Sequence, residues 1–429
     1  MFEPTGSQRD AASVIFNLPG YRVIEAVDLP LGGRRVKVQP DDIADGCPTC
    51  GVMSSRVHAW TLQRVRDVPH AGRIEVVVRK PRLVCAEPAC RRRTFTHTTS
   101  QLPTRSRCTT RLRTAALAAV IDSGRAVAEV AAAYGVAWWT VQATVNAAAV
   151  LLPDVDQCWV RRLGIDEHRY RRVRWFRDDT GGWRRVEPWM STIVNADTGQ
   201  VLGVVDGRDS AAVGGWLAAR SVAWRARIQV VAIDPSAAFR RAITEQLPDA
   251  LISVDPFHLV QLANLMVTRV RQRLVREREH RRGRKIDPAW AHRTLLLRGY
   301  NTLSHRGRVK LQTVFDLDDP TDELSAAWGV KEQLRRLLKT TTVEQVRHEK
   351  MILLRHVLAA DMIETWRLWA TVDGWWPAIE VLITTGVTNA RTEAANTGIK
   401  QIKRTGRGYR NPAHYQARIL LRSAARRAA

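Results

Sequence analysis

The stretch RRLGIDEHRYRR (residues 161–172) decides the fold, together with QVVAIDPSAAFRR (residues 229–241). In each stretch a short apolar run, typical of a buried strand, ends on an aspartate: Asp166 in the first and Asp234 in the second. A carboxylate at the end of a buried strand is costly unless it is paired or binds a cation. The two stretches therefore predict two strands that bring acidic groups to a functional site.

A third acid, Glu393, lies in the polar segment VTNARTEAANTGIKQIKR (387–404), which has a helical pattern. On such a helix Asn396, Lys400 and Arg404 share the face of Glu393. Three carboxylates that converge form a divalent-metal site for phosphoryl transfer, with Mg²⁺ or Mn²⁺ as the metal. We therefore predict that this glutamate and the two aspartates are the catalytic, metal-binding residues.

The chain of 429 residues is long enough for two or three domains and carries a net charge of +25. Lysine and arginine are clustered between Arg269 and Lys285 and again after Glu393, where no acid follows. Arg-rich codon usage alone would not cluster the charge. The clustering favours nucleic acid over a membrane as partner, because no amphipathic anchor or lipidation signal accompanies it. The candidate phosphate-binding residues are Arg281, Arg282, Arg284, Lys400, Lys403 and Arg404.

The amino terminus, MFEPTGSQRD, has no charged segment leading into an apolar stretch, so we expect no signal peptide. No apolar run approaches the length of a membrane span. We therefore expect the six cysteines to be cytosolic thiols or metal ligands rather than disulfides.

Two cysteine pairs, CPTC and CAEPAC, bracket strand-like sequence that includes RIEVVV. Four thiolates suit tetrahedral Zn²⁺, so the pairs predict a zinc ribbon or finger. The second pair has the looser C-x4-C spacing, and His58, His70 and His97 are nearby alternatives as ligands. Two unrelated pairs of buried thiols are the other alternative. The candidate zinc ligands are Cys47, Cys50, Cys85 and Cys90.

An alanine-rich segment, GRAVAEVAAAYGVAWWTVQATVNAA, has the pattern of a helix, a turn at Gly135 and a second helix. This order is typical of a helix-turn-helix, whose second helix presents its first residues to base edges. An ordinary αα-hairpin in a structural bundle is the alternative. A zinc module next to it in a basic chain favours DNA binding. The candidate base-contacting residues are Trp138, Trp139, Thr140, Gln142 and Thr144.

Beyond Pro153 strands dominate, beginning with a meander of CWVRRLGID, VEPWMSTIVNADTG and QVLGVVDGR. A helix, a strand, a helix and a final strand, ALISVD, follow. This order is typical of an α/β ribonuclease H-like core, in which the strands of Asp166 and Asp234 are neighbours. Residues 257–383 have helical spacing and form a predicted insertion before the segment of Glu393.

Asp255 and His258, in VDPFH, follow the last of these strands. One interpretation is that they support the catalytic acids or orient the scissile phosphate. The other is structural: His258 begins the insertion helix and Asp255 caps it. Glu167 is expected to face away from Asp166, solvated or bound to arginine, and Asp209 to cap a helix.

The motifs together closely resemble the insertion-sequence transposases of the ISL3 family, in one order from about residue 45 to 420. They are the two cysteine pairs, WWTV, GIDE, AIDPSAAFRRAI, DPFHLVQLAN, AWGVKEQLR and NARTEAANTGIKQIKRTGRGYRN. The resemblance implies a DDE enzyme of a bacterial mobile element, with Asp166, Asp234 and Glu393 as the triad and the four cysteines as zinc ligands.

The expected function is DNA transposition with two Mg²⁺ ions about 4 Å apart, for strand cleavage and strand transfer. Expected partners are double-stranded DNA, as terminal inverted repeats and as target, and a second copy of the chain. The expected location is the cytoplasm, at the nucleoid. A ribonuclease H-like nuclease or resolvase is one alternative, with little need for a zinc module and helix-turn-helix. A non-catalytic DNA-binding regulator is the other, and it would need only the N-terminal half.

The predicted organisation has six parts along the chain. They are an N-terminal segment (1–46), a zinc-binding module (47–108), a helix-turn-helix domain (109–152), the first part of the catalytic core (153–256), a helical insertion (257–383) and the last part of the core with a basic tail (384–429).

Overall fold

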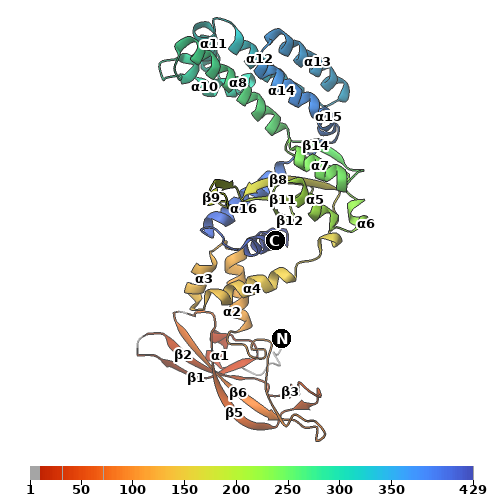
Figure 1. Cartoon of the computed structure of the whole chain (residues 1–429). Coiled ribbons are helices and arrows are strands. Elements are labelled where there is room, and N and C mark those ends of the chain that lie inside the picture. The colour runs from red at the N-terminus through yellow and green to blue at the C-terminus, as the bar shows by residue number, and fades with distance from the viewer. Residues whose placement is uncertain (1–9, 31, 71, 429) are drawn as a thin grey trace, which may run out of the picture. The chain divides into compact units, whose positions relative to one another are not determined.

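The structure is a computed structural model that describes residues 10–30, 32–70 and 72–428. The chain divides into two compact units. One runs to Leu152 and also contains the residues from Ile402 onward, and the other is Pro153–Gln401. Figure 1 labels their helices and strands. Within the described ranges, no helix combines the length and the apolar character that crossing a membrane requires.

The first unit opens with helix α1 (Ala11–Phe16) and a five-stranded sheet. The strands are β1 (Tyr21–Asp28), β2 (Arg34–Pro40), β5 (Val57–Val65), β6 (Ile74–Val84) and β7 (Thr94–Thr96). Between β2 and β5 in the chain, β3 (Asp45–Gly46) and β4 (Met53–Ser54) form a separate two-stranded ribbon. The sheet has the order β1-β2-β6-β5, with β7 paired to β6. Since β1 and β2 share this sheet with β5–β7, the boundary expected at residue 46 does not separate two folded parts.

Three helices follow, α2 (Thr110–Ile121), α3 (Val127–Tyr134) and α4 (Trp138–Val150). Gly135 ends α3 with φ of 62°. This left-handed conformation is one that glycine adopts without strain, so the residue turns the chain sharply into α4. The helix, turn and helix expected here are present.

The C-terminal helix α17 (Pro412–Ala428) packs on these helices within the first unit. Leu421 is buried in the same apolar cluster as Val120. Arg418, also buried, donates hydrogen bonds of 2.9 Å to the carbonyl oxygen of Gly124 and 2.7 Å to that of Arg125. The assignment of all of 384–429 to the catalytic core is therefore wrong for its last part, where apolar burial and a buried arginine fix α17 to the helix-turn-helix.

The second unit contains a five-stranded mixed sheet. Its strands are β8 (Arg162–Arg169), β11 (Trp189–Asn195), β12 (Val201–Asp206), β13 (Val230–Ile233) and β14 (Leu251–Val254), in the order β12-β11-β8-β13-β14. The first three pair antiparallel as a meander, and β8, β13 and β14 pair parallel. The prediction that the strand of Asp166 (β8) and the strand before Asp234 (β13) are neighbours is confirmed.

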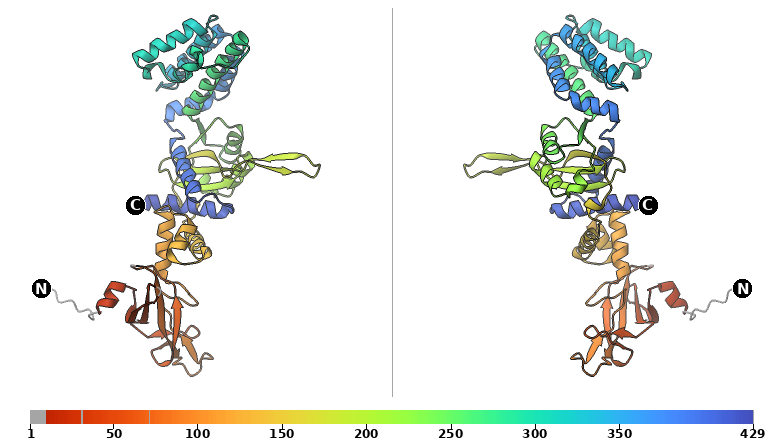
Figure 2. Two further views of the ribbon diagram at one scale, coloured as in Figure 1. Left: turned by 90° about the vertical axis from the view of Figure 1, so that its left-hand side faces the viewer. Right: turned by 90° about the vertical axis from the view of Figure 1, so that its right-hand side faces the viewer.

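Short helices connect and cover this sheet: η1 (Val155–Gln157), α5 (Ser210–Ala218), α6 (Val222–Arg225) and α7 (Ala237–Gln246). Side chains from α5, α6 and α7 form one core with the sheet, in which Leu163, Trp224 and Phe239 are buried. A hairpin of β9 (Arg174–Arg177) and β10 (Trp183–Val186) was not expected from the sequence. It projects from the unit in Figure 2.

The segment expected as a helical insertion is helical throughout most of its length. It comprises α8 (Pro256–Glu279), α9 (Pro288–Ala291), α10 (Arg293–Leu297), η2 (Tyr300–Thr302), α11 (His305–Asp318), α12 (Glu323–Leu337), α13 (Val343–Ala360), α14 (Ile363–Gly374) and α15 (Trp376–Thr385). The chain then enters α16 (Ala390–Thr405), the helix that carries Glu393.

Candidate active site and DNA-binding elements

The two aspartates lie side by side at one edge of the sheet. Asp166 is on β8, and Asp234 directly follows β13. Those strands are parallel neighbours in which Ile165 pairs with Ile233, so the next residue of each strand is an aspartate. Both isoleucines are fully buried. Their burial fixes the two strand ends, and so it fixes the positions of the aspartates that follow them. The expected convergence of these two acids is present.

Helix α16 brings Glu393 toward the same edge, because residues on either side of it bind both strands. The side chains that lie within 4.8 Å of one another at this edge are those of Asp234, Asp255 and His258. Asn389 donates its side-chain amide to the carbonyl oxygen of Ile165, at 3.3 Å, and to Oδ1 of Asp234, at 3.4 Å. One turn beyond Glu393, Asn396 donates to Oδ2 of Asp166 at 2.7 Å. Glu393 thus lies between two asparagines that each contact one of the aspartates.

A glycine on β8 lets α16 approach the sheet this closely. A Cβ atom at Gly164 would collide with Oγ1 of Thr392 and lie 2.9 Å from Oδ1 of Asn389. Only glycine leaves this space, which explains why the GIDE motif begins with a glycine directly before Ile165. The sequence shows the glycine but not its helix partner, so this contact was not predicted.

A buried polar chain holds Asn396 in place. Its Oδ1 accepts a hydrogen bond of 2.9 Å from the hydroxyl of Thr192, which in turn lies 3.0 Å from Nδ1 of His168. All three side chains are buried. A buried network of this kind fixes the amide of Asn396 toward Asp166. Sequence reasoning placed Asn396 on the right face but missed Thr192 and His168, which carry no motif of their own.

The carboxylates are held where ionisation is unfavourable. Burial raises the pKa of Asp166 to about 6, and the nearby charge of Asp234 adds to this, while the hydrogen bond from Asn396 opposes it. Burial and the carboxylate of Asp255 raise the pKa of Glu393. Carboxylates crowded together in this way are stabilised by a bound cation.

His258 joins two acids at the same edge. Its Nε2 lies 2.9 Å from Oδ2 of Asp234, and its Nδ1 lies 3.1 Å from Oδ2 of Asp255. These hydrogen bonds raise the pKa of His258 to about 10, so the ring is an imidazolium at neutral pH. Asp255 occupies the N-cap position of α8, but its side chain makes no capping hydrogen bond. The geometry therefore favours support of the acids over a purely structural role for this pair.

Glu167 and Asp209 have the kinds of partner that the sequence suggested, but Glu167 lies near the site, where burial and the charge of Asp234 raise its pKa. Glu167 forms an ion pair with Arg208, with 3.7 Å between the charged atoms. Asp209 caps α5 by accepting a hydrogen bond of 2.8 Å from the backbone N–H of Ala212.

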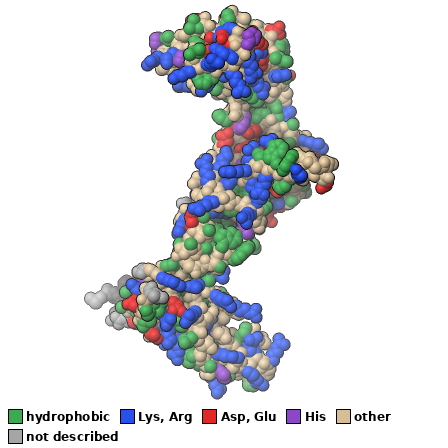
Figure 3. Space-filling view, turned by 60° about the vertical axis from the view of Figure 1, so that its left-hand side comes forward, with side chains coloured by type: hydrophobic (Ala, Val, Ile, Leu, Met, Phe, Trp, Pro, Cys, Tyr) green, Lys and Arg blue, Asp and Glu red, His purple; other side chains and the backbone are tan. Residues whose placement is uncertain are grey.

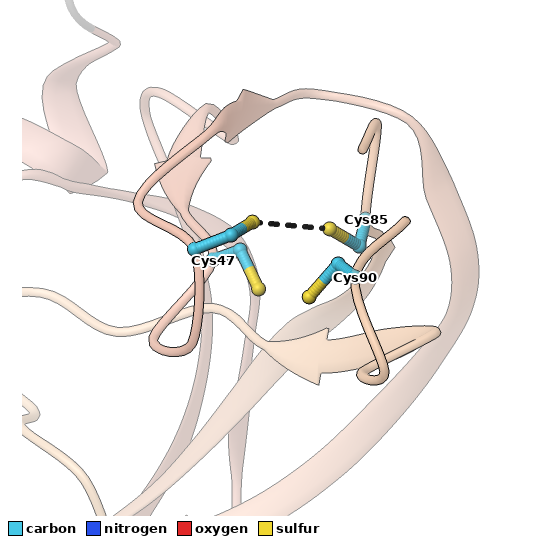
Figure 4. Close-up of side chains that lie close together, drawn as sticks. Cys47, Cys85 and Cys90 are labelled. Atoms are coloured by element: carbon cyan, nitrogen blue, oxygen red, sulfur yellow. Dashed lines mark hydrogen bonds between the residues drawn. The ribbon is translucent and has the colours of Figure 1, made fainter. Parts of the chain in front are cut away.

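The four cysteines converge in the first unit, and Figure 4 labels three of them, Cys47, Cys85 and Cys90, whose side chains lie close together. Their sulfur atoms all lie within 4.8 Å of one another, with 3.6 Å between those of Cys50 and Cys85. Although burial opposes it, hydrogen bonds from backbone N–H groups lower the pKa of Cys47 to about 6. Four thiols arranged in this way form a complete tetrahedral zinc set without a histidine.

The predicted base-contacting side chains of α4 divide into two groups. Trp138 and Trp139 are exposed, and Thr140 is half-buried. Gln142 is buried, and its amide donates a hydrogen bond of 2.8 Å to Asn146. In this structure the side chain of Gln142 is therefore bound within its own helix and less accessible than those of Trp138 and Trp139.

The predicted phosphate-binding residues divide in the same way. Arg281 is bound by Asp287 through two contacts of 2.8 Å, so its charge is already paired within the insertion. Arg282 and Arg284 are exposed. On α16, Lys400 and Arg404 are exposed and Lys403 is half-buried. Lys and Arg side chains are visible across the face shown in Figure 3.

Comparison with known families accounts for most of the chain. Residues 44–90 match the zinc-finger of transposases IS204/IS1001/IS1096/IS1165, and residues 98–149 match the helix-turn-helix domain of transposase family ISL3. Residues 163–419 match a catalytic-domain model described as "Transposase" (DDE_Tnp_ISL3). These matches define a transposase with a zinc finger and a helix-turn-helix ahead of its catalytic domain. The chain belongs to the ISL3 family of transposases.

Named relatives agree with this family. The chain is 25% identical to the transposase for insertion sequence element IS1557 of Mycobacterium tuberculosis, over 70% of this chain and 68% of the relative. It is 26% identical to the transposase for IS1001 of Bordetella parapertussis, over 68% and 67%. Among solved structures, the Drosophila P element transposase strand transfer complex aligns with a TM-score of 0.39 and 9% identity, covering 74% of this chain and 91% of that one.

Proposed function

We propose that this transposase cleaves DNA at the ends of its insertion sequence and transfers those ends to target DNA, with Asp166, Asp234 and Glu393 as ligands of Mg²⁺ or Mn²⁺. The observation that carries the proposal is the position of Glu393 between two asparagines, one bonded to each aspartate. The strand order β12-β11-β8-β13-β14 supports a ribonuclease H-like core.

The donor set fits a hard divalent cation. Carboxylate oxygens are the ligands that Mg²⁺ takes in proteins. Burial raises the pKa values of Asp166 and Glu393, and neighbouring carboxylates add to the rise, which a bound cation would offset. Bound cations would stabilise the attacking and leaving oxygens of an in-line displacement at phosphorus. The same site serves hydrolysis and strand transfer, because only the attacking hydroxyl changes.

The residues around the acids act by fixing their positions. Asn396 holds Asp166, and the imidazolium of His258 holds Asp234 through one ring nitrogen and Asp255 through the other. His258 and Asp255 are therefore proposed as positioning residues. Such partners orient metal-binding oxygens and offset part of their mutual repulsion.

The DNA path is proposed from the exposed basic and aromatic side chains. On α4, Trp138, Trp139 and Thr140 would read base edges of the terminal inverted repeats. Phosphates would be bound by Arg282, Arg284, Lys400, Lys403 and Arg404. The four cysteines would hold one structural Zn²⁺ that orders their loops beside the sheet. The joining of two element ends supports an active complex with at least two copies of the chain, and DNA as the proposed substrate supports a location at the nucleoid.

The proposal is tested with a supercoiled donor plasmid that carries the element's own ends. The purified protein is incubated with this donor and a target plasmid in Mg²⁺, and the breaks and joints are mapped at nucleotide resolution. We expect breaks at both element ends and joints to target DNA. Breaks scattered along the plasmid without joints would indicate a nuclease, and specific binding without breaks in either Mg²⁺ or Mn²⁺ would indicate a DNA-binding regulator.

A further inference from the structure

The hairpin of β9 and β10 has no role in the site described above, and its composition is unusual for a surface. Six arginines but only two acids, Asp178 and Asp179, lie between Arg171 and Val186. Trp175 is 56% exposed and Trp183 is 62% exposed. A two-stranded ribbon without a core behind it is marginally stable in water, so large exposed aromatic side chains on it indicate a binding surface.

The strand register places arginine and tryptophan alternately on one face of the ribbon. Trp183 pairs with Arg177, and Trp175 pairs with Arg185, so these four side chains share a face. Arg177 lies over the ring of Trp183, with 5.6 Å from its guanidinium carbon to the ring centroid. The two tryptophans are therefore diagonal neighbours separated by positive charge. Figure 3 shows hydrophobic side chains beside basic ones on the projecting part of this unit.

One of the two acids of the hairpin is engaged in shaping its turn. Oδ1 of Asp178 accepts hydrogen bonds from the backbone N–H groups of Thr180, at 3.0 Å, and Gly182, at 2.7 Å. Gly181 adopts a φ of 81°, which only glycine adopts readily. Neither strand itself carries a carboxylate, but Glu187, the residue after β10, forms an ion pair with Arg185 at the base of the hairpin.

The hairpin emerges from the sheet at the end where the catalytic aspartates lie. Asp166 pairs with Thr192, and the pairing continues to Arg169 and Trp189. The hairpin follows at once, closed at its base by a hydrogen bond of 2.9 Å from Tyr170 N–H to the carbonyl oxygen of Pro188. Arg174, where β9 begins, is eight residues from Asp166, a length of chain that spans at most about 28 Å, less than one turn of a DNA duplex. DNA bound at the carboxylates is therefore within reach of this surface.

We propose that the hairpin is a DNA-binding arm in which arginines bind phosphates while Trp175 and Trp183 stack on bases that are unpaired beside the cleavage site. The inference rests on the proposed function for the identity of the substrate. Arginine favours phosphate, and an exposed tryptophan face stacks on any unstacked base without sequence preference. Paired bases within a duplex offer no such face to the arm, which favours DNA with an unpaired stretch over an intact duplex.

The test compares binding of the full chain to a labelled duplex and to the same duplex with a short unpaired gap, in a buffer without Mg²⁺. Wild-type protein should bind the gapped DNA more tightly. The double variant Trp175→Ala/Trp183→Ala should lose about tenfold or more of its affinity for gapped DNA, with little change for the duplex. Trp159→Ala is the matched control, since Trp159 is 64% exposed in the same unit and precedes β8.

A second variant, which removes the hairpin, tests whether a loss of affinity comes from the hairpin or from misfolding of the double variant. Replacing residues 173–185 with two glycines should give the same loss, and unchanged zinc content and melting temperature would show that both variants fold. Equal affinity of wild-type protein for both DNAs, or a preference for gapped DNA that survives both variants, would overturn the proposal. Binding here needs no catalysis, so failure of the hairpin proposal leaves the metal-site proposal standing, and the reverse also holds.

Discussion

Asn396 donates a hydrogen bond of 2.7 Å to Asp166, a residue 230 positions earlier in the chain. This bond joins helix α16 to strand β8, and so it ties the position of Glu393 to that of the first aspartate. Because Asn396 is buried and its Oδ1 is bound by Thr192, its amide has one orientation, with the N–H groups toward the carboxylate. The catalytic geometry thus depends on how closely the helix approaches the strand.

Gly164→Ala should abolish DNA cleavage while leaving DNA binding intact. The new methyl group would collide with Thr392 and displace α16 from the sheet. Removing the hydroxyl in the double variant Gly164→Ala/Thr392→Ala should restore part of the activity, because the closest clash disappears. Cleavage assays of the two variants check this. Wild-type cleavage by Gly164→Ala would show that the helix does not need this approach.

His258→Ala should lower cleavage by about 10- to 100-fold and raise the Mg²⁺ concentration needed for half-maximal rate. Without the imidazolium, Asp234 and Asp255 lose the positive charge that lies between them. Rates measured across a Mg²⁺ series distinguish this role from a general loss of structure. His348→Ala, which changes an exposed histidine of α13, is the control and should keep the wild-type Mg²⁺ dependence. A curve for His258→Ala that overlays that of the control would contradict the role.

The purified protein should contain one zinc per chain, held by the four clustered thiols. Cys85→Ser should lower both zinc content and binding to element ends, because three thiolates bind zinc far more weakly than four. Cys158→Ser is the control, since Cys158 lies outside the cluster. Elemental analysis of freshly purified protein decides the matter, and a zinc-free protein that still binds the ends would rule the site out.

Asp166→Asn should raise the melting temperature at pH 7.5 in a buffer without added divalent cations. The pKa of Asp166 in the folded chain is raised from 3.8 to about 6, so the folded state binds the proton more tightly than the unfolded state. The stability that protonated Asp166 contributes is therefore lost as the pH rises from about 4 to 6. Above that range the ionised carboxylate destabilises the folded state by its full amount. We expect an increase of a few degrees at pH 7.5 and none at pH 4. An equal increase at both pH values would show that ionisation of Asp166 is not its cause.

The sequence allowed prediction of those parts of the fold and site that depend on local patterns. Apolar runs ending on Asp166 and Asp234 predict buried strands, and the two cysteine pairs predict the cluster of four thiols. The helix of Glu393 was predicted from its polar face. These features are readable because strand burial, helical period and ligand spacing are each set by residues near one another in the sequence.

Features that depend on tertiary packing were not predictable in this way. Gln142 has the right position on a recognition helix but is buried. Arg281 belongs to a basic cluster but is bound by Asp287, and this pairing depends on how the insertion folds. The hairpin after β8 was missed because its strands, exposed on both faces, lack the alternation of apolar and polar residues that marks a half-buried strand.

The central claim is that Asp166 is a metal ligand, and two adjacent carboxylates test it most directly. Asp166→Asn and Glu167→Gln each remove one negative charge at neighbouring positions, but only Asp166 is placed by Asn396 at the site, whereas Glu167 pairs with Arg208. Cleavage of a donor carrying the element ends is measured in Mg²⁺ beside binding of those ends. We predict that Asp166→Asn binds at least as well as wild type and loses cleavage by several orders of magnitude, whereas Glu167→Gln keeps most of it. Retained cleavage in Asp166→Asn, or an equal loss in both variants, would contradict the account.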